Sequence, residues 1–179
     1  FLLIRSMILI LSASNREGNL TTLFAQQCKA LLDEKGVENR LFSLSQLPEE
    51  LVLQSVYQYD TSVFNKWSQE LIQACEKILF IVPEYNGSIP GILKLFIDGV
   101  SPKDFHGKKS VLIGVSAGRA GNLRGMDHLT DILHYLQVEV HPQKLPISKL
   151  YDLLEEGKIV DEETLALLEK QVQILIDYQ

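Results

Sequence analysis

Ile78-Leu79-Phe80-Ile81-Val82-Pro83-Glu84-Tyr85-Asn86-Gly87 joins five consecutive apolar residues to a loop of turn-forming residues. A short apolar run without polar alternation is typical of a strand that is buried on both faces of a parallel sheet. Residues 7–11 and 111–115 have the same character, and each leads into a polar or glycine-rich loop. We therefore predict three central strands.

Two further runs, 40–44 and 138–141, mix polar and apolar residues and are expected to be edge strands. Helical patterns with a period of three to four residues lie between the strands or after them, at 20–35, 62–75, 89–100, 122–136 and from Asp161 onward. Strands that alternate with helices form a parallel sheet with helices on both faces. The pattern predicts an α/β three-layer sandwich with a five-stranded parallel sheet in the order 2-1-3-4-5.

This strand order predicts where a ligand binds. The order reverses between strands one and three, and ligands of open α/β sheets bind beyond the carboxyl ends of the strands at such a point. We therefore expect the site to be formed by the loops 12–19, 83–91 and 116–122.

Composition excludes several other classes of protein. The chain has 179 residues, which fits one domain; we expect this domain to cover 7–179, with 1–6 as an N-terminal extension and Met7 as the natural start. Lys and Arg number 17 against 23 Asp and Glu, and the formal charge of −6 argues against a nucleic-acid partner. No apolar segment is long enough to cross a bilayer, so no membrane partner is expected.

The cysteines and histidines do not suggest a metal site. Cys28 and Cys75 form no C-x-x-C pair, so neither a disulfide framework nor a zinc site is predicted, and a reducing cytoplasm is the expected location. No two of the four histidines are four residues apart, as a helix-borne metal site would need.

The first loop has the residue types that bind phosphate. Ser14, Asn19 and Thr21 can donate hydrogen bonds near the start of a helix, and Arg16 can supply a charge-assisted contact. The alternative interpretation is a helix cap with a surface arginine.

The second loop is rich in residues that restrict the backbone. Pro83, Gly87, Pro90 and Gly91 favour a rigid loop, on which Tyr85 can form an apolar wall beside a planar ring. Taken alone, the loop also fits an ordinary ordered turn.

The third loop supports a competing hypothesis. Residues 114–118 match the G-x-S-x-G motif of serine hydrolases, with Ser116 as the nucleophile. The acid would be Asp127 or Asp131, and the base would be His134 or His141. The expected geometry is poor, because Asp127, Asp131 and His134 fall in one helix that begins shortly after the serine.

Together the three loops resemble those of the NADPH-dependent FMN reductase family, a flavodoxin-like group that includes quinone, azo-dye and chromate reductases. Residues 83–94 match its distinctive motif P-E-Y-N-x-S-x-P-G-x-L-K. Residues 13–19 are similar to its motif G-S-x-R-x-x-S, with Asn19 where serine is common, and 116–121 resemble its glycine-rich loop.

The resemblance implies a set of residues that bind the cofactor FMN. It assigns the phosphate to Ser14, Arg16, Asn19 and Thr21. It assigns the isoalloxazine ring to Pro83, Glu84, Tyr85, Asn86 and Gly87, with Ser116 and Gly118 approaching from the neighbouring loop. It implies no catalytic side chain, because the flavin carries the chemistry.

The resemblance also implies an activity. It points to an oxidoreductase that passes hydride from NADPH or NADH through FMN to a small acceptor such as free flavin, a quinone or an azo compound. A homodimer or homotetramer is implied as well. Because the chain lacks the G-x-G-x-x-G dinucleotide fingerprint, we expect the nicotinamide to bind transiently over the flavin, with ping-pong kinetics.

Two flavin-binding alternatives remain open at this point, a flavodoxin-type electron carrier and a non-catalytic flavin sensor. Flavodoxin phosphate loops resemble T-x-T-G-x-T, whereas Ser14-Asn15-Arg16 contains an arginine and favours the reductase. The long apolar segment 45–60 is expected to cover the pocket, contact a partner subunit or pack on its own domain.

Overall fold

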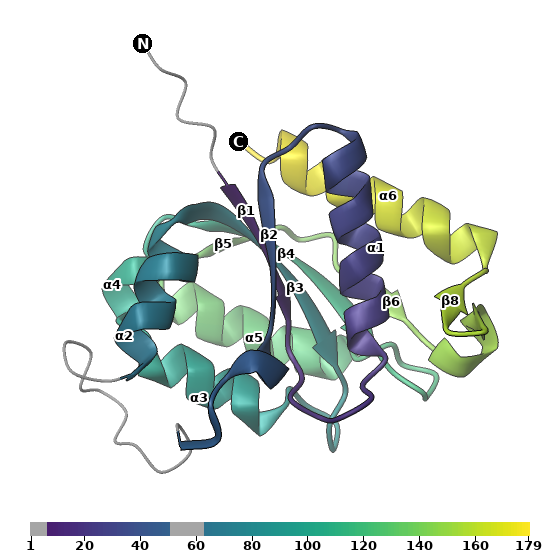
Figure 1. Ribbon diagram of the computed structural model, residues 1–179, viewed down its shortest axis with the longest axis horizontal. Coiled ribbons are helices and arrows are strands. Elements are labelled where there is room, and N and C mark those ends of the chain that lie inside the picture. The colour runs from purple at the N-terminus through teal and green to yellow at the C-terminus, as the bar shows by residue number, and fades with distance from the viewer. Residues whose placement is uncertain (1–6, 51–62) are drawn as a thin grey trace.

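The computed structural model of the protein describes residues 7–50 and 63–179. Its main sheet is parallel, with the order β2-β1-β3-β4-β5 and with β6 also paired to β4 (Figure 1). The strands are β1 (Met7–Ser12), β2 (Asn39–Ser43), β3 (Cys75–Pro83), β4 (Lys109–Val115), β5 (Glu139–Val140) and β6 (Leu145–Ile147). The predicted fold class and strand order are confirmed.

Helices cover both faces of the sheet, which explains why the central strands are apolar at consecutive positions (Figure 1). In β1, Ile8 and Ile10 belong to the core beneath α1 (Thr21–Glu34) and α6 (Glu162–Asp177). Leu9 and Leu11 point to the opposite core. That second layer consists of α2 (Val63–Trp67), the π-helix η3 (Ser68–Gln73), α3 (Gly91–Gly99), α4 (Pro102–Phe105) and α5 (Leu123–Tyr135).

The fifth strand differs from its prediction, because two short strands share its place beside β4. Strand β5 pairs with Lys109 and Ser110, whereas β6 pairs further along β4, at Ile113 to Val115. The sequence Leu-Pro-Ile of β6 gave no strand signal, since proline cannot donate a ladder hydrogen bond and is tolerated only at an edge or a strand end.

The segment that follows β6 was also not predicted. It forms the 3₁₀ helix η4 (Leu150–Leu153) and a small antiparallel hairpin of β7 (Leu154–Glu155) and β8 (Lys158–Ile159) before α6 begins.

Most predicted helices occur with slightly different bounds. The helix expected over 62–75 is α2 followed by η3, and the one expected over 89–100 begins at Gly91, after the extended residue Pro90. Of the segment 45–60, only 45–50 belongs to the described residues, where the 3₁₀ helix η1 (Leu44–Gln46) turns the chain away from β2. The predictions for 51–60 and for the extension 1–6 lie outside the described residues.

Asp161 gives α6 a pH-dependent cap. Its carboxylate accepts a hydrogen bond from the Thr164 backbone N–H at 2.8 Å, and hydrogen bonds from Thr164 hold the pKa of Asp161 below its ordinary value. Because the folded pKa lies below the unfolded one, this stabilisation is complete above the unfolded pKa and is lost as the pH falls through the folded pKa.

We therefore predict that Asp161→Asn, which keeps an acceptor but cannot titrate, unfolds at a lower temperature than the wild type at neutral pH. The gap should close as the pH falls from neutral through the folded pKa of Asp161, where the wild-type carboxyl becomes protonated too. Thermal unfolding followed by circular dichroism measures this, with Glu163→Gln in the same helical turn as the control. A gap of constant size across this pH range would contradict the prediction.

Candidate functional site

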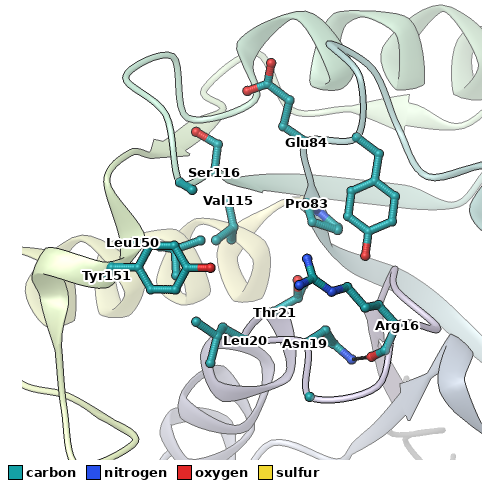
Figure 2. A pocket seen from close by; sticks show the side chains of 13 residues that line it. Arg16, Asn19, Leu20, Thr21, Pro83, Glu84, Val115, Ser116, Leu150 and Tyr151 are labelled. Atoms are coloured by element: carbon teal, nitrogen blue, oxygen red, sulfur yellow. Dashed lines mark hydrogen bonds between the residues drawn. The ribbon is translucent and has the colours of Figure 1, made fainter.

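A cavity of about 330 Å³ lies at the carboxyl ends of β1, β3 and β4 (Figure 2). This volume is within the range of roughly 300–1,000 Å³ that is usual for small-molecule sites. The cavity draws on all three predicted loops and on the segment after β6. Its lining residues are Arg16, Gly18, Asn19, Leu20, Thr21, Pro83, Glu84, Tyr85, Val115, Ser116, Ala117, Leu150 and Tyr151.

Hydrogen bonds within the first loop hold its shape. The Asn19 side-chain amide donates to the Arg16 carbonyl at 2.8 Å, and its oxygen accepts from the Thr22 hydroxyl at 3.0 Å and the Thr22 N–H at 3.3 Å. Ser14, which is fully buried, accepts from the Arg16 N–H at 3.2 Å. Asn19 and Ser14 therefore shape the loop and hold Arg16 in place.

Other donors of the first loop face the cavity without partners. In the described part of the chain, the Arg16 guanidinium makes no ion pair, and the Thr21 hydroxyl makes no hydrogen bond. The backbone N–H groups of Leu20 and Thr21, at the start of α1, also lack a partner among those residues. Unbonded donors, a cation and a helix N-terminus together suit an anion, and a phosphate monoester in particular.

The second loop is a tight hairpin turn. Tyr85 and Ser88 exchange backbone hydrogen bonds of 3.0 Å, and Asn86 and Gly87 between them both have positive φ, 51° and 74°. This is the geometry of a type I′ turn, for which Asn-Gly is the favoured pair. The Tyr85 and Ser14 hydroxyls lie 2.7 Å apart and share a hydrogen bond, so the second loop is tied to the first.

Helix α5 supports the back of the same turn. The Ser88 hydroxyl is 2.8 Å from His128 Nδ1, and a Cβ atom at Gly87 would lie 2.8 Å from the Arg124 guanidinium. A side chain at position 87 would therefore meet backbone strain, and the Arg124 guanidinium would have to move away.

The third loop does not provide a hydrolase site. The Ser116 hydroxyl donates to the Gly118 carbonyl at 3.2 Å and accepts from the Gly121 N–H at 3.1 Å. The residue is 5% exposed, and no described histidine contacts its hydroxyl. The hypothesis of a Ser116 nucleophile is wrong: the hydroxyl serves to close the loop, and the required base is missing from its surroundings.

The structure brings most of the predicted site residues together. Seven line the cavity: Arg16, Asn19, Thr21, Pro83, Glu84, Tyr85 and Ser116. The remaining four do not line it, and each lies within two residues of a lining residue in the same loop: Ser14, Asn86, Gly87 and Gly118. Among the four, Ser14 lies beneath the first loop, and Asn86 and Gly87 form the tip of the turn.

Six lining residues were not among the predicted site residues. Gly18, Leu20, Val115 and Ala117 lie in or beside the predicted loops. The other two, Leu150 and Tyr151, belong to η4, outside these loops. They follow a strand that was not predicted, and Leu-Tyr matches no ligand-binding motif. The available signal was a pair of large side chains that follows Leu145-Pro146-Ile147 after Ser148 and Lys149.

Outside this cavity, the described residues show no reactive thiol and no metal site. Burial raises the pKa of Cys28 to about 12 and that of Cys75 to about 11, so both thiols stay protonated and act as core residues. Within 7–50 and 63–179, no three His, Cys, Asp or Glu side chains gather as a metal site would require. No helix in these ranges combines the length and the apolar content needed to cross a membrane.

Comparison with known proteins agrees with this geometry. Residues 6–152 match the family of NADPH-dependent FMN reductases. The chain belongs to this family. It is 32% identical over 175 residues to an NAD(P)H-dependent FMN reductase of Pseudomonas aeruginosa, which covers 94% of this chain and 92% of the relative.

Two other similarities extend the comparison. An FMN-dependent NADPH-azoreductase of Staphylococcus saprophyticus is 31% identical over 113 residues, or 62% of this chain and 60% of the relative. The solved structure of FerB, a flavoenzyme NAD(P)H:(acceptor) oxidoreductase from Paracoccus denitrificans, superposes with a TM-score of 0.78 at 21% identity, covering 97% and 96% of the two chains. FerB shows the shared fold.

Membership of the family confirms the recognition made from the loop motifs. The protein is an oxidoreductase of the FMN-dependent type, with NADPH or NADH as the electron donor. The comparisons favour the reductase over the electron carrier and the flavin sensor.

Proposed function

We propose that this protein binds FMN in the cavity described above and reduces a small-molecule acceptor at the expense of NADPH or NADH. One observation carries the proposal: the donors of Arg16 and Thr21, which have no partner among residues 7–50 and 63–179, meet at the start of α1, beside the loop that carries the family motif. Neighbouring loops would thus bind the phosphate and the ring of one ligand.

The residues present fit the phosphate of FMN. Arg16 can pair with the dianion, and the Thr21 hydroxyl can donate to one of its oxygens. The N–H groups at the start of the 14-residue helix α1 add the positive end of the helix dipole. Asn19 and Ser14, whose polar groups are engaged within the loop, would hold these donors in position.

The second and third loops fit the planar part of the ligand. Pro83, Glu84 and Tyr85 line the cavity where β3 ends, and Ser116 lines it where β4 ends. Hydrogen bonds fix both loops before any ligand arrives, which lowers the entropic cost of binding. Asn86, Gly87 and Gly118 would contribute through backbone groups at the edge of this site.

When bound, FMN supplies the redox chemistry by accepting a hydride from the nicotinamide and passing the electrons to the acceptor. The task of this chain is then to bind and orient, and no side-chain acid or base is required. The nicotinamide and the acceptor would occupy the open side of the cavity in turn, since the sequence has no dinucleotide-binding fingerprint.

The acceptor we propose is a small planar molecule such as free flavin, a quinone or an azo compound. The cavity is open and lined by more apolar than charged residues, which suits flat molecules of low charge. The similarity to an azoreductase supports the azo class.

The free, buried thiols of Cys28 and Cys75 are compatible with a reducing compartment, and we propose the cytoplasm.

Arg16→Ala tests the placement of the phosphate. The variant should bind FMN more weakly by about 1.5–3 kcal/mol, the range for hydrogen bonds to charged groups, and should bind riboflavin as the wild type does. Calorimetric titration of the apoprotein measures both affinities. Arg119→Ala, which changes an arginine outside the cavity, is the matched control. Equal losses for FMN and riboflavin would contradict the assignment.

Steady-state kinetics and an anaerobic spectrum test the activity. We predict parallel double-reciprocal lines for NADPH and a quinone, because the two substrates share one site in turn. Stoichiometric NADPH should bleach the flavin absorbance at about 450 nm, and a quinone should restore it. Intersecting lines would argue against the shared site, and FMN binding without bleaching would favour a carrier or a sensor.

We also propose that the protein is a homodimer or homotetramer. Helix α5 exposes two large apolar side chains, Leu123 and Tyr135, which are 48% and 86% exposed. Light scattering coupled to size-exclusion chromatography should give two or four times the chain mass of 20.2 kDa. A mass of one chain at micromolar concentration would refute the proposal.

A further inference from the structure

The wall of the cavity formed by η4 carries a tyrosine that no recognised motif includes. Tyr151 lines the cavity yet is 63% exposed, so its ring extends into open space and does not pack in the core. None of the described residues forms a hydrogen bond with the Tyr151 hydroxyl. An aromatic side chain with a free polar tip at a ligand site calls for a functional explanation.

The backbone that carries Tyr151 is firmly held. The Leu150 N–H donates to the Ser116 carbonyl at 3.1 Å, and the Lys149 N–H donates to the Gly118 carbonyl at 2.8 Å. Leu150 is 9% exposed and belongs to the core beneath α1 and α6. These contacts attach η4 to the third loop and leave Tyr151 at the cavity rim.

The Tyr151 side chain is directed into the cavity. In Figure 2 the Tyr151 hydroxyl points into the cavity, toward the side where the Arg16 guanidinium and Thr21 lie. Arg16 and Thr21 come from the loop after β1, whereas Tyr151 comes from the opposite wall. Three side-chain donors from two walls thus face one region of the cavity.

We propose that the Tyr151 hydroxyl donates a hydrogen bond to the phosphate of the bound FMN, from the wall opposite Arg16. A phosphate monoester has three terminal oxygens, and donors of the first loop approach it from one side only. A neutral phenol hydroxyl can satisfy an oxygen on the other side without adding charge. Tyr151 would then favour FMN over riboflavin. This inference rests on the proposed function.

A different role for Tyr151 makes a different prediction. If only its ring mattered, as an apolar wall, phenylalanine would replace it without loss, and FMN and riboflavin would respond alike. Tyr151→Phe therefore separates the hydroxyl from the ring, and Tyr151→Ala removes both.

The experiment is a fluorescence titration of the apoprotein with FMN and with riboflavin, for the wild type and for Tyr151→Phe, Tyr151→Ala and Tyr135→Phe. Tyr135→Phe is the matched control, because this exposed tyrosine of α5 does not line the cavity. We expect Tyr151→Phe to weaken FMN by about tenfold or more, in line with a hydrogen bond to a charged group. Its riboflavin affinity should stay within about twofold of the wild type.

The outcomes separate this inference from the proposed function. If Arg16→Ala weakens FMN while Tyr151→Phe binds both ligands as the wild type does, the phosphate site stands and the role of Tyr151 is overturned. Loss of both ligands in Tyr151→Ala alone would identify the ring as a wall and also overturn it. If the wild type fails to bind FMN, the proposed function falls together with the inference. Circular dichroism confirms that each variant is folded.

Discussion

Burial of β1, β3 and β4 on both faces is the constraint on which the rest of this structure depends. Strands that are apolar on both sides must lie in the middle of a parallel sheet, and their carboxyl ends then open at one edge. The register makes this edge level, because Ser12 pairs with Ile81, and Pro83 pairs with Val115. The ladder continues one residue further through Ala13 N–H to the Ile81 carbonyl and Glu84 N–H to the Val115 carbonyl. The three loops therefore leave the sheet side by side and surround one cavity.

The polar residues of the first and third loops divide into two groups. Ser14, Asn19 and Ser116 form hydrogen bonds within the loops themselves. Arg16 and Thr21, at the start of α1, have donors without a partner among the described residues. A site organised in this way needs little rearrangement when a ligand binds. The arrangement suits an enzyme whose cofactor performs the chemistry, since the protein supplies position and charge.

Ser116 and Tyr85 differ in whether their surroundings support the sequence motifs in which they lie. Both residues lie in sequence motifs directly after buried strands, and both motifs are well formed. The Ser116 hydroxyl forms hydrogen bonds with Gly118 and Gly121, and no described histidine forms a hydrogen bond with it. The hydrolase motif therefore lacks the base that would activate its serine. The family motif around Tyr85 agrees with its surroundings, because the Asn-Gly pair forms the turn that these residues prefer. A motif is informative when the local geometry that it requires is also present.

The sequence by itself determined the central strands, their order, the three loops and the family, because each depends on local patterns: apolar runs, helical periodicity and turn residues. Only the tertiary structure decided that two short strands share the place beside β4, that Asn19 and Ser14 bond within their loop, and that Tyr151 reaches the cavity from η4. These features depend on residues that are far apart in the chain. The contact between Gly118 and Lys149, for example, exists because β6 pairs with β4, and no local pattern around either residue encodes that pairing.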